Sequence, residues 1–103
     1  MDPGKERRST RRFRVSLAVM VTPAQGHAIP ARTRDISLQG ICFYLSRPLA
    51  AGTAIHFRIT LPADVTLSAP VRIQCLGQIV RVEESPASTA IAAIIQNYQF
   101  LAD

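Results

Sequence analysis

The chain has 103 residues and a net charge of +5, with 48% hydrophobic and 18% charged residues. This apolar content excludes a wholly disordered chain, and the length predicts one domain without a separate output domain. No apolar run is as long as the ~20 residues that a membrane-spanning helix requires, so we expect neither a membrane segment nor a membrane partner.

Alternating apolar residues predict a series of short strands along the chain. The predicted strands cover residues 13–21, 28–37, 40–46, 53–62, 71–84 and 89–100. In the fifth predicted strand, the apolar residues change from one alternating set of positions to the other around Leu76 and Gly77, as a β-bulge would cause. The alanines of the sixth also suit a helix, but alternation favours a strand. Short strands without a long helix predict an all-β fold, a small antiparallel barrel or sandwich.

The positive charge lies mainly at the N-terminus. Residues 1–14 hold six basic and two acidic side chains, whereas residues 15–103 hold six basic and five acidic ones. Clustered charge of this kind indicates an anionic partner. We therefore expect a flexible basic arm over residues 1–12 and a folded domain over residues 13–103.

Few residues suggest chemistry or metal binding. Cys42 and Cys75 lie in apolar runs without a Cys-x-x-Cys pair, so we expect buried thiols in a reducing, cytoplasmic setting; a disulfide stays open. His27 and His56 have no third ligand at a metal-like spacing. Since no Gly-x-Ser-x-Gly motif occurs either, we expect no enzyme, no catalytic residue, no metal and no cofactor.

Two arginine pairs in the arm share the spacing R-x-x-x-R: Arg8 with Arg12, and Arg7 with Arg11. A guanidinium is always charged and planar, so it binds a phosphate or the O6/N7 edge of guanine with two parallel hydrogen bonds. A solvated basic tail is the alternative interpretation.

The second motif is DISLQG, residues 35–40. Asp35 and Ser37 are two residues apart, so in an extended segment they point the same way. Together they could bind the N1–H and N2–H₂ edge of a guanine, and Gly40 would supply a turn with positive φ. An ordinary Asx turn between strands is the alternative.

The ordered pair of motifs, with Asp35 23 positions after Arg12, resembles the PilZ domain family. The later segments GQIVRVEE and AAIIQNYQF are similar to the family's long fifth strand and closing strand, so the resemblance covers nearly the whole chain. It implies a six-stranded antiparallel β-barrel with a flexible arginine-rich arm that binds cyclic di-GMP, a bacterial second messenger.

The resemblance also implies roles for individual residues. Arg8 and Arg12 would bind phosphates and guanine, while Asp35, Ser37 and Gly40 form the second motif. The register Arg7/Arg11 is the alternative, and otherwise these two are auxiliary ligand residues. Arg34, beside Asp35, would add charge to the same site, although exposed strand-edge arginines are common.

The implied output is a signal that passes to an unidentified effector protein when ligand binding reorders the arm. We expect the protein to be a monomer or a homodimer. One alternative is a PilZ-fold interaction module that binds no nucleotide. Another is a basic-arm barrel that binds nucleic acid. The nearly neutral body and only six aromatic residues argue against nucleic acid as a partner.

Overall fold

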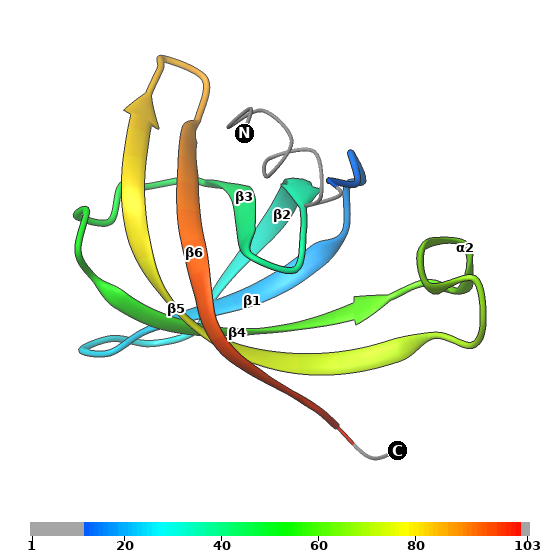
Figure 1. The fold of residues 1–103 in the computed structure, drawn as a ribbon. Coiled ribbons are helices and arrows are strands. Elements are labelled where there is room, and N and C mark those ends of the chain that lie inside the picture. Colours follow the sequence, from blue (N-terminus) through cyan, green and yellow to red (C-terminus); the bar gives the residue numbers. More distant parts are fainter. Residues whose placement is uncertain (1–11, 102–103) are drawn as a thin grey trace, which may run out of the picture.

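A computed structural model describes residues 12–101 of the chain. Its elements are β1 (Ala18–Pro23), β2 (Ile29–Ile36), β3 (Gly40–Leu45), β4 (Ala54–Leu61), α2 (Ala63–Thr66), β5 (Val71–Glu84) and β6 (Thr89–Phe100). The strands close a barrel in the order β1-β2-β3-β6-β5-β4, and every neighbouring pair is antiparallel. Figure 1 shows β5 and β6 curving along the barrel, and α2 at the tip of the β4–β5 hairpin. The predicted six-stranded antiparallel barrel is confirmed.

The core fills the barrel because alternate residues of each strand point inward. In β4, Ile55, Phe57 and Ile59 are all buried, as their spacing predicts. In β1, Met20 is 46% exposed between the buried residues on either side of it. The side chains that are almost fully buried are Phe43, Phe57, Ile41, Ile79, Ile91, Val21, Thr33 and Cys75.

The first strand is shorter than predicted, because regular pairing begins at Ala18 instead of residue 13. Before that point the backbone amide of Thr33 in β2 donates to the Leu17 carbonyl at 2.9 Å, and the Thr33 hydroxyl adds side-chain hydrogen bonds to the same segment. It accepts a hydrogen bond from the Leu17 amide at 2.9 Å and donates one to the Val15 carbonyl. Phe13 and Ile36 then exchange two backbone hydrogen bonds of 2.8 and 3.0 Å. These contacts bring Arg12, the residue before Phe13, to the end of β2.

Three residues have no partner in the strand register and form β-bulges. Arg34 is the additional residue of β2, Val80 that of β5 and Gln96 that of β6. The predicted shift between Leu76 and Gly77 is present, but the additional residue lies opposite, in β6. The inward phase of β5 changes later, at Val80, since bulges reverse the alternation of the strand that carries them.

Both cysteines are buried free thiols, as predicted, but on different sides of the barrel wall. Cys75 belongs to the hydrophobic core, where burial raises the pKa of its thiol to about 11. Cys42 lies outside that cluster, paired with Asp35 of β2. Of the remaining expectations, the closing strand is confirmed to Phe100, and the segment between the fourth and fifth predicted strands contains the short helix α2.

Gly77 supports the barrel because β6 passes very close to it. A Cβ atom at this position would lie 2.2 Å from the carbonyl oxygen of Ile94. We expect Gly77→Ala to lower the free energy of unfolding by about 1–3 kcal/mol, the usual effect of overpacking a tight site. Urea denaturation measures this. Gly26→Ala is the control, since its Cβ would meet a Pro23 side-chain carbon at 3.2 Å. Equal unfolding midpoints for the two variants would contradict the prediction.

Candidate ligand-binding site

The β2 bulge places Asp35 on the outer side of the barrel. Thr33 pairs with Phe43 and faces the core, but after the bulge at Arg34 it is Ile36 that faces inward. Asp35 therefore stands outside, opposite Cys42, although its neighbours leave it only 6% exposed. A buried carboxylate requires compensating hydrogen bonds or charges.

Two arginines supply that compensation, one at each carboxylate oxygen. Arg12 donates through Nε to Oδ1 of Asp35 at 3.0 Å, and its Nη2 contacts the same oxygen. Arg34 donates through Nε to Oδ2 at 2.9 Å. The guanidiniums remain near the surface, with 49% of the Arg12 side chain and 36% of the Arg34 side chain exposed. The carboxylate thus holds two positive groups side by side at the barrel surface.

The electrostatics favour the ionised form of Asp35. Burial would raise the pKa of its carboxyl, but hydrogen bonds from Arg12 and Arg34, with their charges, outweigh burial and lower it. The hydrogen bond to Asp35 likewise raises the pKa of Arg34. The three groups therefore carry two positive charges and one negative charge, leaving net positive charge for an anion.

Ser37 closes the turn between β2 and β3 and also reaches Arg12. Its hydroxyl oxygen accepts hydrogen bonds from the amides of Gln39 at 3.2 Å and Gly40 at 3.1 Å. Arg12 Nη1 also donates to this oxygen, at 3.4 Å. Asp35 and Ser37 therefore do point the same way, as predicted, and both contact Arg12.

The prediction of positive φ at Gly40 is wrong, since Gly52 is the glycine with positive φ within residues 12–101. The requirement for glycine has a different cause. A Cβ atom at Gly40 would lie 3.1 Å from the carbonyl oxygen of Ala93, so the missing side chain lets β6 approach. Gly40 thus lets β6 lie slightly closer to the motif turn than a larger residue would.

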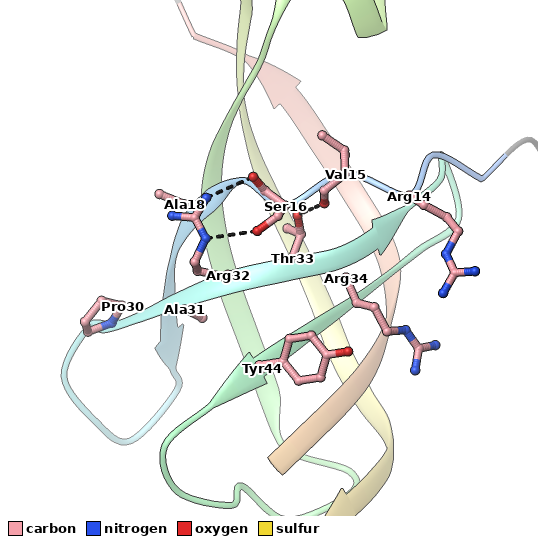
Figure 2. A pocket seen from close by; sticks show the side chains of 10 residues that line it. All are labelled: Arg14, Val15, Ser16, Ala18, Pro30, Ala31, Arg32, Thr33, Arg34 and Tyr44. Atoms are coloured by element: carbon pink, nitrogen blue, oxygen red, sulfur yellow. Dashed lines mark hydrogen bonds between the residues drawn. The ribbon is translucent and has the colours of Figure 1, made fainter. Parts of the chain in front are cut away.

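Two hollows flank Arg34 on the outer surface. The first has a volume of about 790 Å³, and Figure 2 shows the Arg14 and Arg34 guanidiniums pointing the same way there, with the Tyr44 ring beside Arg34. Of the two aromatics after Gly40, Tyr44 thus faces outward at 39% exposed, and Phe43 is buried. The second hollow, of about 490 Å³, extends from Arg12 and Arg34 over β3 and β6 to β5.

The structure brings together five of the predicted site residues: Arg12, Arg34, Asp35, Ser37 and Gly40. The other three, Arg7, Arg8 and Arg11, lie outside the described residues. Sequence reasoning missed Arg14 and Arg81, which line the two hollows. The alternation of their segments predicts that both side chains point outward. It does not predict which strands become neighbours, so it could not place either arginine beside Asp35.

Residues 12–101 contain no group of three metal-ligating side chains. The helix in the same range is also too short to span a membrane.

The lowered pKa of Asp35 makes stability depend on pH. Its contribution is complete above the unfolded pKa of 3.8 and is lost as pH falls through the lower folded pKa. We expect Asp35→Asn to lower the free energy of unfolding at pH 7 by about 1–3 kcal/mol. The difference from wild type should shrink as pH falls below the unfolded pKa of 3.8 toward the lower folded pKa, because wild-type Asp35 then protonates.

Urea denaturation across this pH range measures the effect. Asp64→Asn is the matched control, since Asp64 is exposed in the first turn of α2. A difference between Asp35→Asn and wild type that stays constant with pH would refute the assignment.

Comparison with known proteins identifies the fold independently. Among solved structures, the chain is similar to the Bacillus subtilis inhibitor of motility, MotI/DgrA, with a TM-score of 0.72 and 18% identity. That match covers 85% of this chain and 42% of the other, so this chain spans less than half the length of that protein. The PilZ domain of CeSA from a cellulose-synthesizing bacterium matches with a TM-score of 0.63 and 20% identity, covering 84% of this chain and 81% of that one.

Among curated proteins, none matches the sequence. The family model of the PilZ domain, however, matches residues 6–99, which include both motifs and all six strands except the last residue of β6. PilZ domains form a family of cyclic di-GMP receptors and act as binding and regulatory modules instead of enzymes. The chain belongs to the PilZ domain family.

Proposed function

We propose that this PilZ domain binds cyclic di-GMP beside Asp35 and passes the signal to a protein partner through its arm, residues 1–12. The observation that carries the proposal is the pair of guanidiniums, Arg12 and Arg34, held on the two oxygens of one carboxylate. Cyclic di-GMP presents two anionic phosphates and two guanines. Arginines bind both kinds of group, and here two are already oriented.

Preorganisation is the physical reason to favour a small anion over a long polymer. An arginine side chain loses conformational freedom on binding, and that cost is already met where a carboxylate fixes the guanidinium. Arg12 also contacts Ser37 of the motif turn, which restrains it further. A nucleic acid would instead need positive charge distributed over the barrel, whose residues 15–103 hold six basic and five acidic side chains.

In this proposal Asp35 has two tasks. It orients Arg12 and Arg34, and the remaining lone pairs of its oxygens accept from the N1–H and N2–H₂ edge of one guanine. Arg12 and Arg8 bind the phosphates and the O6/N7 edge, with Arg7 and Arg11 as auxiliary charges. Because Arg8 precedes the first described residue, its role rests on the R-x-x-x-R spacing alone.

Calorimetric titration with cyclic di-GMP tests binding, with GTP and cyclic di-AMP as control ligands. We expect saturable binding to wild type and a loss of affinity of about a hundredfold or more for Arg8→Ala/Arg12→Ala, since two charge-assisted contacts disappear. The double variant Arg7→Ala/Arg11→Ala should lose much less affinity for cyclic di-GMP. Arg58→Ala is the control for charge, because Arg58 is exposed on β4, with Gln74 as its partner.

Each contrary outcome has a distinct meaning. A larger loss for the Arg7/Arg11 variant would assign the other register of the motif. No heat with wild type would refute the receptor function and favour the interaction module. Binding that falls steeply with salt and lacks a requirement for guanine would favour nucleic acid.

The relay through the arm predicts a local change in backbone dynamics. We expect hydrogen exchange of amides in residues 1–12 to slow when cyclic di-GMP binds, because ordering the arm protects its amides. Exchange in the core of β4, which lies away from Asp35 in the barrel order, should not change and serves as the internal control. Binding without any protection of the arm would separate ligand binding from the proposed relay.

A further inference from the structure

One row of residues crosses four neighbouring strands from the candidate site to β5. Asp35 pairs with Cys42, Cys42 with Ala92, and Ala92 with Arg81. Since neighbouring strands lie about 4.8 Å apart, Asp35 and Arg81 are about 14 Å apart across the sheet. The two small residues between them form the floor of the hollow of about 490 Å³. We call this hollow the bulge groove.

A β-bulge forms the wall at each end of the bulge groove. In β2 the bulge turns Arg34 and Asp35 to the outer side, and in β5 the bulge at Val80 leaves both Val80 and Arg81 exposed. Bulges re-aim side chains and are frequent beside functional sites. Here two of them direct arginines toward one groove from opposite ends.

The walls offer apolar as well as charged contacts. Val80 is 53% exposed and Ile94 is 41% exposed, and both line the bulge groove outside the hydrophobic core. Apolar side chains beside a floor as small as Ala92 and Cys42 leave a flat space with apolar edges. A planar base fits such a space, because its faces favour apolar contact and its edges favour hydrogen bonds.

The Arg81 side chain lines the same groove as Arg12 and Arg34, the two arginines beside Asp35. Burial raises the pKa of the Cys42 thiol, while the charges of Arg34, Arg81 and Arg12 all act against that rise. Arg81 has one acidic neighbour, Glu83, at 4.0 Å, and both side chains are about 60% exposed. Such exposed pairs contribute little, so Glu83 does not prevent Arg81 from binding a ligand.

We infer that Arg81 binds the second guanine of cyclic di-GMP at its O6/N7 edge, with that base lying over Cys42 and Ala92 in the bulge groove. The inference rests on the proposed function and adds a specificity-determining residue outside both sequence motifs. One guanine then binds at Asp35 and the other at Arg81. The row of paired residues sets the distance between the two positions.

The test compares cyclic di-GMP with 3′,3′-cyclic GMP–AMP, in which one guanine is replaced by adenine. With its guanine at Asp35, the mixed dinucleotide presents adenine to Arg81, and adenine lacks the O6 acceptor. We expect Arg81→Gln to weaken cyclic di-GMP binding by about tenfold to a hundredfold. The same change should leave the affinity for cyclic GMP–AMP nearly unaltered.

Two further variants complete the experiment. Arg58→Gln removes the same charge from β4 and should bind both ligands like wild type. Ala92→Leu fills the floor of the bulge groove without changing its charge and should weaken the binding of cyclic di-GMP. Thermal unfolding verifies that the barrel of this variant is intact.

The outcomes separate this inference from the proposed function. If wild type binds cyclic di-GMP and Arg81→Gln binds it equally well, the inference is wrong and the receptor function stands. Equal losses for both dinucleotides would reduce Arg81 to general charge attraction and overturn its role in reading guanine. If wild type binds no dinucleotide, both proposals fail together.

Discussion

The ion pairs of Asp35 are the interaction on which the outer face of this barrel depends. One carboxylate, almost covered by its surroundings, holds Arg12 at one oxygen and Arg34 at the other. Removing the carboxylate would leave two positive groups close together without compensation. Removing either arginine would leave a buried charge only partly satisfied, which is costly in a protein interior. The arrangement is therefore stable only when all three groups are present.

The bulge at Arg34 explains how a carboxylate comes to occupy this position. A regular β2 would continue the alternation of Ile29, Ala31 and Thr33 and turn Asp35 into the core. The additional residue reverses the alternation, so Ile36 fills the core and Asp35 faces out. The backbone irregularity thus separates an apolar interior from a charged exterior within two residues of one strand.

Hydroxyl groups and small residues make room for the rest of the site. The Thr33 hydroxyl anchors the segment after Arg12 where regular pairing is absent, and the Ser37 hydroxyl closes the motif turn. Gly40 lets β6 approach that turn, and Cys42 and Ala92 keep the neighbouring surface low. The hydrogen-bonded strands of the barrel hold these groups in place, which is what a preorganised binding surface requires.

The sequence by itself determined the β-class and the approximate strand positions, and it predicted five residues of the candidate site, because alternation and motif spacing are local properties. The two motifs, through their resemblance to the PilZ family, predicted Asp35, Ser37 and Arg12 as site residues, with Arg7/Arg11 as the alternative register. Only the tertiary structure decided that Gly40 serves close approach instead of a positive φ, and that Gln96 and Val80 are the bulged residues. Only it decided that Arg81, 46 positions after Asp35 in the sequence, ends the row that Asp35 begins. Strand order and register join residues far apart in sequence, and they depend on barrel closure, which no local pattern encodes.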